Sequence, residues 1–237
     1  MASVLVPARF NGPPASGQGG YSAGALAAHV DGRASVSLRR PVPLDVELEV
    51  RVEGDAAHAF VNDELVLEAL AAPPLATWDA PAVSLEEARA AAARFASPAE
   101  GTFDHCFVCG RARHDDGFGI YLGPVEGTDL VAAPWTPPAW SASDDDVVLP
   151  EFVWSALDCP GYFAVFGVAG ELAFLARQQS ELLRPIHAGV EYVAVGRPLG
   201  CEGRKGFAAT AILDPDGGVL AHSEQLLIAP REGMSHK

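Results

Sequence analysis

The sequence predicts an α+β fold in which one arrangement, a buried helix followed by an antiparallel sheet, occurs twice. The first observation behind this prediction is an internal repeat between residues 33–72 and 177–229. Each copy contains a Leu-Arg-Arg-Pro or Leu-Leu-Arg-Pro step that ends at Pro41 or Pro185, followed by an alternating segment, a polar turn and two β-rich segments. The second observation is an apolar, helix-compatible segment ahead of each strand set.

The strands are predicted from period-two alternation of apolar and polar residues. The alternating segments are VELEVRV in the first copy and VEYVAV in the second. Short polar turns are expected at Asp63-Glu64 and from Asp214 to Gly218. Residues 117–123 (GFGIYLG) and 129–135 (DLVAAPW) supply further strand candidates.

Both predicted helices are apolar on nearly every side, which is typical of helices buried in a core. The first lies within residues 17–30 and is opened by glycines. The second lies within residues 150–170, with Pro150 at an N-terminal position and Glu151 in the first turn.

These elements predict two halves joined by a connector. The first half covers residues 1–75 and the second covers residues 105–231. Residues 76–104 form a linker with a short helix, which begins with a Ser-x-x-Glu capping box at Ser84 and Glu87. The polar residues 232–237 are expected to fray.

Composition excludes several classes of protein. The 237 residues include 16 Lys and Arg against 31 Asp and Glu, a net charge of −15, which argues against a nucleic-acid-binding protein. The chain shows neither a long apolar run for a membrane span nor the basic and apolar regions of a secretory signal. Four cysteines are too few for a disulfide-built fold of this length, so a cytoplasmic protein with reduced thiols is expected.

Two segments resemble the acyl-CoA thioesterase-like superfamily. FNGPPASGQGGYSAGALA, at residues 10–27, resembles the Gly-Gly helix start of its two-hotdog members, which hydrolyse medium- and long-chain acyl-CoA. CFVCG followed by GFGIYLGP, within residues 106–124, resembles the entry into single-hotdog thioesterases. The resemblance covers most of the chain and implies a double hotdog fold, with two antiparallel sheets each wrapped around a central buried helix.

The resemblance also implies site residues. In the two-hotdog thioesterases an aspartate on the second central helix, a Ser or Thr on a nearby strand and a Gln on the last strand hold the attacking water. Asp158 and Gln225 match the aspartate and the glutamine. The hydroxyl has no match, because the corresponding segment reads FLARQQSELL, where Gln178, Gln179 or a slipped Ser180 could replace it.

Other residues are candidates for binding the substrate, and each has a structural alternative. The N–H groups near Gly19 and Gly20 would suit a thioester oxygen, although these glycines could simply allow close helix-to-sheet packing. Asn11 is a further catalytic candidate, or a turn residue. Trp154 could line the ligand pocket or belong to the core. Arg204 and Lys205 could contact the phosphates of coenzyme A or form a solvated hairpin turn.

The Cys106-x-x-Cys109 pair does not by itself predict a metal site. A structural zinc site needs four ligands, whereas Cys159 and Cys201 are isolated in the sequence. The expectation is therefore no metal and no cofactor, with the pair in a packed loop.

The sequence as a whole predicts a hydrolase of acyl-CoA or a related acyl thioester that works by direct water attack. A non-catalytic acyl-thioester binding module of the same fold is the alternative that the missing hydroxyl favours. A hydratase or dehydratase of this fold would need an Asp-His pair at a helix start, and neither predicted helix start has one. Exposed sheet surfaces could pair two chains into a homo-oligomer.

Overall fold

The computed structural model describes residues 2–95, 101–113 and 116–231, so the predicted frayed tail at 232–237 lies outside the described residues. The helices are α1 (Gly19–Ala27), α2 (Leu85–Ala92) and α3 (Pro150–Val165). The strands are β1 (Ala2–Leu5), β2 (Ala34–Leu38), β3 (Glu47–Glu53), β4 (Ala56–Val61), β5 (Glu64–Ala71), β6 (Gly123–Pro124), β7 (Val131–Trp135), β8 (Phe174–Leu182), β9 (Tyr192–Glu202), β10 (Lys205–Leu213) and β11 (Val219–Ile228).

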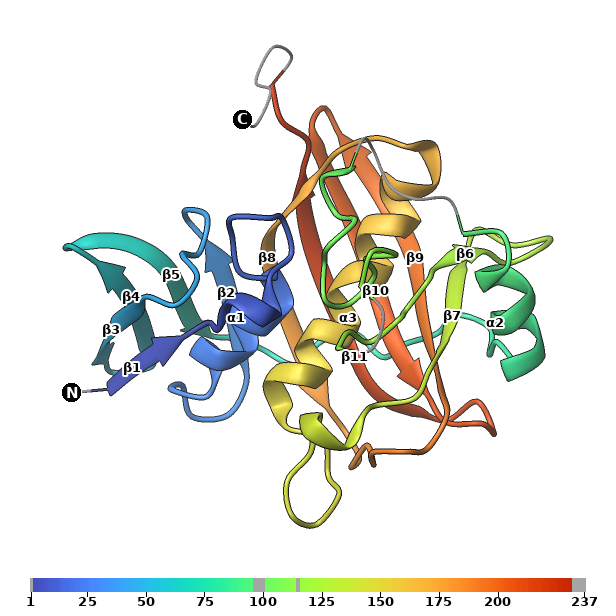
Figure 1. Ribbon diagram of the computed structural model, residues 1–237, viewed down its shortest axis with the longest axis horizontal. Helices are drawn as coiled ribbons and strands as arrows, with labels where there is room; N and C mark the ends of the chain where they lie inside the picture. Colours follow the sequence, from blue (N-terminus) through green and yellow to red (C-terminus); the bar gives the residue numbers. More distant parts are fainter. Residues whose placement is uncertain (1, 96–100, 114–115, 232–237) are drawn as a thin grey trace.

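The strands form one antiparallel sheet whose order repeats the same pattern from its middle outwards (Figure 1). On one side of the middle the order is β2, β5, β4, β3, β1, and on the other it is β8, β11, β10, β9, β7, with β6 at the edge. The strands that follow α1 therefore correspond one to one with the strands that follow α3. This correspondence confirms the α+β fold and its repeat, whereas the division of the chain at residues 75 and 105 stays a prediction.

The two predicted sheets are continuous with each other. Strands β2 and β8 pair antiparallel, with Val36 opposite Gln178 at the centre of a short three-pair register. Leu38 ends β2 two residues later, and the two central strands separate there. The joint between the halves is therefore narrow, and a pocket described below lies beside it.

Helices α1 and α3 lie side by side against one face of the sheet (Figure 1). Both are buried along most of their length, as their all-round apolar sequence predicts. Pro150 occupies the first turn of α3 and Glu151 is the acidic residue of that turn, as expected. Pro160 lies inside α3 without ending it, because the helix continues to Val165.

The tight turns use the residues that such turns favour. Asn62 and Asp63 adopt φ angles of 50° and 61° between β4 and β5, the left-handed region that Asn and Asp tolerate in two-residue hairpin turns. The Asp214 carboxylate accepts hydrogen bonds from the N–H groups of Asp216 and Gly218 between β10 and β11. The turn at Asp214 to Gly218 lies where it was predicted, whereas the β4–β5 turn lies at Asn62-Asp63, one residue before the predicted Asp63-Glu64.

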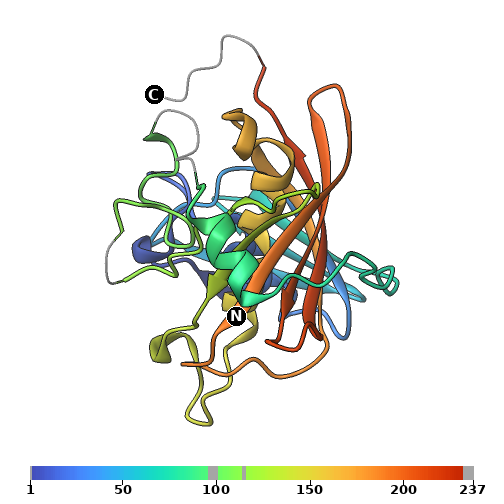
Figure 2. The ribbon, with the colours of Figure 1, turned by 90° about the vertical axis from the view of Figure 1, so that its right-hand side faces the viewer.

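The connector helix α2 begins as the sequence predicts, because Ser84 and Glu87 form both hydrogen bonds of the capping box. It packs against β7 at the far end of the sheet (Figure 2). Directly before the connector, the Leu75 N–H donates to Glu181 and the Pro73 carbonyl accepts from Gln179. The connector is thus fastened to β8 before it reaches α2.

One strand prediction is wrong. Of residues 117–123, only Gly123 joins a ladder, as part of β6. Gly119 has a left-handed φ of 66°, which interrupts an extended strand, and the N–H groups of Phe118 and Ile120 donate to the carbonyls of Phe107 and Val108. The segment therefore pairs with the Cys-Phe-Val-Cys loop, whereas the segment at 129–135 contains β7 as predicted.

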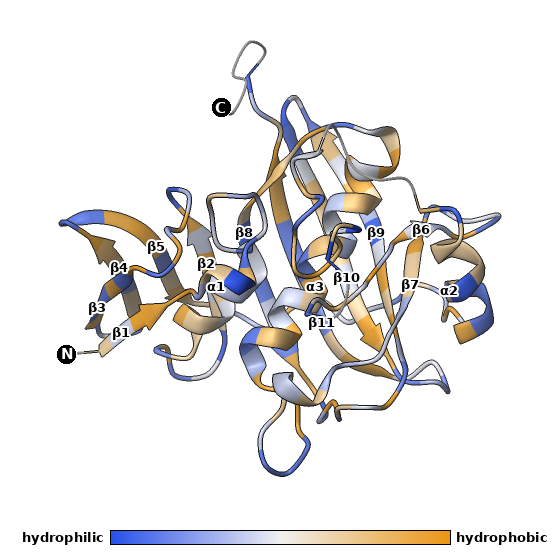
Figure 3. Cartoon of the chain, in the orientation of Figure 1, coloured by the Kyte–Doolittle hydropathy of each residue, from blue (hydrophilic) through white to orange (hydrophobic). Residues whose placement is uncertain are grey.

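Apolar residues form the core around the helices and the sheet, and hydrophilic residues lie in loops, on α2 and at intervals along the strands (Figure 3). Within the described residues, no helix combines the length and the hydropathy needed to cross a bilayer.

Candidate active site

Asp158 joins the two central helices. It lies on α3 with 8% of its surface exposed, and its Oδ2 accepts hydrogen bonds from the N–H of Gly20 (2.8 Å) and from Nε2 of Gln18 (2.6 Å). Both donors come from the start of α1. A carboxylate at a helix N-terminus also interacts favourably with the helix dipole.

The glycines of α1 bring the two helices this close together. A Cβ atom on Gly20 would lie 2.4 Å from the Trp154 carbonyl oxygen, and one on Gly24 would lie 2.7 Å from the Cα of Glu151. Gly20 and Gly24 therefore permit helix-to-helix contact. Gly19 permits the helix-to-sheet contact considered from the sequence, because a Cβ there would lie 2.8 Å from Cδ2 of Leu175 on β8. The Trp154 side chain is buried at this crossing, with Cβ and Cγ against Gly24.

Burial raises the pKa of Asp158 to about 7. The hydrogen bond from the Gly20 N–H opposes the increase, and the nearby Cys106 adds to it. The other carboxylate oxygen, Oδ1, accepts no hydrogen bond from any residue that the structure describes. A carboxylate with a pKa near neutrality and an unused oxygen is suited to accept a proton from water.

Gln18 is a site residue that the sequence analysis missed. Its Oε1 accepts from the N–H of Tyr21 (2.7 Å) and so caps α1, while its Nε2 reaches Asp158. Glutamine is not among the favoured N-cap residues. The signal available in the sequence was a polar residue directly before two glycines.

A second polar group lies on the sheet beneath α3. Gln178 of β8 and Gln225 of β11 are opposite each other and both are buried. Their Nε2 atoms donate to backbone carbonyls of α3, Gln178 to Trp154 (3.0 Å) and Gln225 to Leu157 (2.6 Å). Neither Oε1 has a hydrogen-bond partner among the described residues, so each glutamine presents a buried acceptor next to the helix.

Hydroxyl groups accompany both glutamines. Ser180 lies two residues beyond Gln178 on the same strand face and accepts a hydrogen bond from it (2.9 Å). Ser223 accepts from Gln225 (3.3 Å) and shares a hydrogen bond with Thr210 (2.8 Å). Sequence analysis named Ser180 but missed Ser223 and Thr210, although two-residue spacing put Ser223 on the Gln225 face.

Gln179 was also a candidate to replace the missing Ser or Thr hydroxyl, but it lies on the opposite face of β8. Its side chain donates to the carbonyl of Pro73, which lies between β5 and the connector. It is therefore separated from α3 by the sheet itself.

Asn11 lies in the turn before α1. Its Oδ1 accepts from Arg113 (2.5 Å), and its Nδ2 donates to the carbonyls of Gly12 and Pro13. None of the hydrogen bonds among the described residues joins Asn11 to Asp158 or to Gln225. These contacts match the turn role that the sequence left open for Asn11.

A pocket of about 380 Å³ lies beside the joint between β2 and β8. Its lining includes Leu38, Leu175, Arg204 and Arg231. A Cβ on Gly19 would lie 3.0 Å from both the Cβ of Leu175 and Oδ2 of Asp158, so Gly19 lies close to a lining residue of this pocket and to the carboxylate.

Arg204 and Lys205 are exposed at the β9–β10 turn, as the solvated-turn alternative expected. Arg204 also lines the pocket, and it donates to the carbonyl of Ala229 (2.7 Å).

The chain is similar over nearly its whole length to three solved structures, one of them described as a thioesterase and one as a hot dog fold protein. A proposed thioesterase II from Thermobifida fusca YX has a TM-score of 0.59 at 16% identity over 97% of this chain and 92% of its own. The tesB protein of Mycobacterium avium subspecies paratuberculosis has a TM-score of 0.56 at 15% identity, over 96% and 91%. A hot dog fold protein of unknown function from Alicyclobacillus acidocaldarius has a TM-score of 0.56 at 12% identity, over 97% and 92%.

No protein-family model matches the sequence, and no curated protein matches it significantly. The whole-chain similarities agree with the repeated strand order and with the paired central helices. The chain therefore has the double hotdog fold.

Proposed function

We propose that the protein is an acyl-CoA thioesterase that hydrolyses its substrate by direct water attack. The observation that carries the proposal is the buried carboxylate of Asp158, which donors from α1 hold at the contact between the two halves. The similarity in fold to a protein described as a thioesterase supports it, although fold alone does not determine activity.

In the proposed reaction Asp158 acts as the general base. Its carboxylate accepts a proton from a water molecule as the water oxygen attacks the thioester carbonyl carbon. The tetrahedral intermediate then collapses, the carbon–sulfur bond breaks, and the proton passes from Asp158 to the departing coenzyme A thiolate. The products are a carboxylic acid and free thiol.

The start of α1 would stabilise the charge that develops on the carbonyl oxygen. The first N–H groups of a helix have no partner within the helix and carry partial positive charge. The Gly20 N–H is used by Asp158, but the Gly19 N–H bonds to no group in the described part of the chain. We assign the binding of the thioester carbonyl oxygen to the N–H group of Gly19.

The pocket beside the joint is the proposed route for the substrate. Leu175 on its lining lies next to Gly19, while Arg204 and Arg231 are also lining residues. An arginine side chain suits the phosphates of coenzyme A, because guanidinium groups form charge-assisted hydrogen bonds to phosphate oxygens. Lys205, next to Arg204, would add a second cation.

The test is thiol release from a panel of short, long and aromatic acyl-CoA substrates, alongside equilibrium binding of the same compounds. We expect at least one substrate to release free coenzyme A at a rate proportional to enzyme concentration. Binding without thiol release would overturn the proposal and favour a non-catalytic acyl-thioester binding module. One observation favours this second candidate. The Nε2 groups of Gln178 and Gln225 already donate to carbonyls of α3, so neither Nε2 group is free to hold a water molecule.

A substitution at Arg204 tests the phosphate contact. Arg204→Ala should raise KM for an acyl-CoA by about 5- to 30-fold, because it removes a charge-assisted contact of about 1–2 kcal/mol. Hydrolysis of the same acyl group on N-acetylcysteamine, which carries no phosphate, should be unchanged. Arg89→Ala, which removes an exposed arginine from α2, is the control, and equal losses with both substrates would contradict the assignment.

A further inference from the structure

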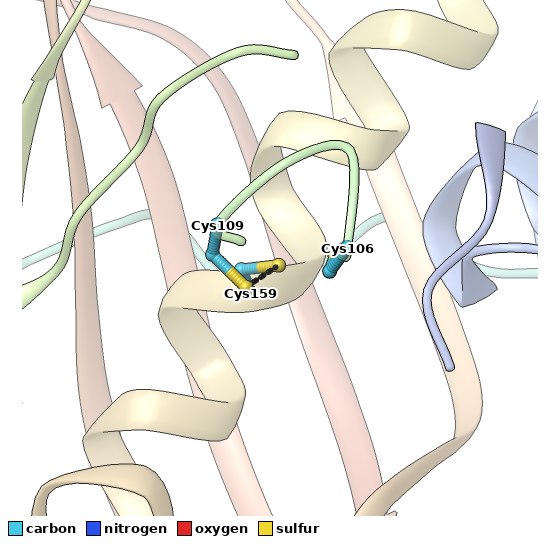
Figure 4. Close-up of side chains that lie close together, drawn as sticks. All are labelled: Cys106, Cys109 and Cys159. Atoms are coloured by element: carbon cyan, nitrogen blue, oxygen red, sulfur yellow. Dashed lines mark hydrogen bonds between the residues drawn. The ribbon is translucent and has the colours of Figure 1, made fainter. Parts of the chain in front are cut away.

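Three buried cysteines meet at one point between the Cys-Phe-Val-Cys loop and α3. The Sγ atoms of Cys106, Cys109 and Cys159 all lie within 4.8 Å of one another. Figure 4 shows Cys106 and Cys109 on the loop and Cys159 on the helix beneath it. The Sγ atoms of Cys109 and Cys159 are 3.4 Å apart, and each of the three side chains is at most 6% exposed.

The Cys-Phe-Val-Cys loop closes on itself at Cys106, because the N–H of Gly110 donates to the Cys106 carbonyl (2.8 Å). A Cβ on Gly110 would lie 2.4 Å from the Asp104 carbonyl oxygen, so the turn requires glycine there. The tight turn therefore holds Cys106 and Cys109 on the same loop above Cys159.

We propose that Cys106, Cys109 and Cys159 bind a zinc ion through their three sulfur atoms. A tetrahedral ion with zinc–sulfur bonds of about 2.3 Å places its sulfur ligands about 3.8 Å apart. The observed arrangement, from 3.4 Å to at most 4.8 Å, spans that separation. Small side-chain movements would therefore complete the three bonds.

Charge also favours a divalent ion. Three thiolates buried near the Asp158 carboxylate would repel one another strongly in an apolar setting, and a zinc ion cancels two of the three negative charges. Binding releases the thiol protons to solvent.

The fourth zinc position is left to water or to a small ligand. No other His, Cys, Asp or Glu joins the three cysteines within the described residues. An open fourth position is what distinguishes reactive zinc sites from closed structural ones. This inference does not depend on the proposed hydrolysis, because it concerns only the cysteine cluster.

Metal content measures the proposal directly. Purified full-length protein, handled without oxygen, should contain one zinc ion per chain by mass spectrometry. Cys106→Ser, Cys109→Ser and Cys159→Ser should each lower zinc affinity by at least about tenfold in competition with a colorimetric chelator. Cys201→Ser, which changes the exposed fourth cysteine outside the cluster, is the matched control and should bind zinc as the wild type does.

Cadmium binding to the wild-type protein tests thiolate coordination directly, so it does not depend on whether a serine variant folds. One cadmium ion per chain should produce the ultraviolet sulfur-to-cadmium charge-transfer absorption and a cadmium-113 resonance typical of thiolate-rich coordination. The proposal is overturned if wild-type protein binds neither ion at one per chain. It is equally overturned if the serine variants retain wild-type affinity.

Discussion

Asp158→Asn is expected to lower kcat for acyl-CoA hydrolysis by about 10²–10⁴-fold while the protein stays folded. The substitution removes the group that accepts the proton from water, and an amide cannot replace it in that role. The asparagine Oδ1 can still accept from the Gly20 N–H and from Gln18, so the contact between α1 and α3 should survive. Thiol release under saturating substrate measures the effect.

The same variant should be more stable than the wild type at neutral and alkaline pH. Burial raises the pKa of Asp158 to about 7, whereas an unfolded aspartate has a pKa near 3.9. The folded wild type therefore loses stability as pH rises from about 4 to about 7, and the loss is complete above pH 7. Removing the charge should recover on the order of 2–4 kcal/mol at pH 8, and less at pH 5, in denaturant unfolding.

Asp63→Asn is the control for both measurements. Asp63 lies exposed in the β4–β5 turn, and asparagine tolerates its left-handed φ, so neither turnover nor stability should change appreciably. If Asp158→Asn hydrolyses acyl-CoA as fast as the wild type, Asp158 is not the base.

Sequence patterns predicted the fold because its helices and strands depend on short, local stretches of sequence. Alternation within each strand, the apolar helices and the Pro41 and Pro185 steps depend on short stretches of chain, and the structure reproduces them in matching positions. The segment at 117–123 failed for the same reason. Its apolar alternation looks like a strand, but Gly119 bends the backbone away from the ladder.

Contacts between distant segments could not be predicted in this way. The hydrogen bond from Gln18 to Asp158 spans 140 residues, and the third cysteine of the cluster lies 50 residues from Cys109. No periodicity or spacing encodes which face of α3 meets α1 or the loop. The resemblance to known thioesterases located Asp158 and Gln225, but only the folded chain shows which donors surround them.

A substitution at the contact between α1 and α3 should strongly lower the stability of the protein. Gly20→Ala is expected to destabilise the protein by about 3 kcal/mol, although alanine is about 1 kcal/mol better than glycine in a helix. The added methyl group would lie 2.4 Å from the Trp154 carbonyl oxygen and 2.8 Å from the Cβ of Asp158, and neither backbone can move without displacing its helix. Denaturant unfolding measures the loss.

Ala90→Gly, at an exposed position of α2, measures the effect of helix propensity alone. It should lower the free energy of unfolding by about 1 kcal/mol. Steric displacement at Gly20 has a second consequence, because the Gly20 N–H that holds Asp158 moves with α1. We therefore expect Gly20→Ala to lose turnover even at temperatures where it stays folded. A Gly20→Ala protein as stable and as active as the wild type would mean that the two helices do not approach this closely, and the proposed position of the attacking water would fail with that contact.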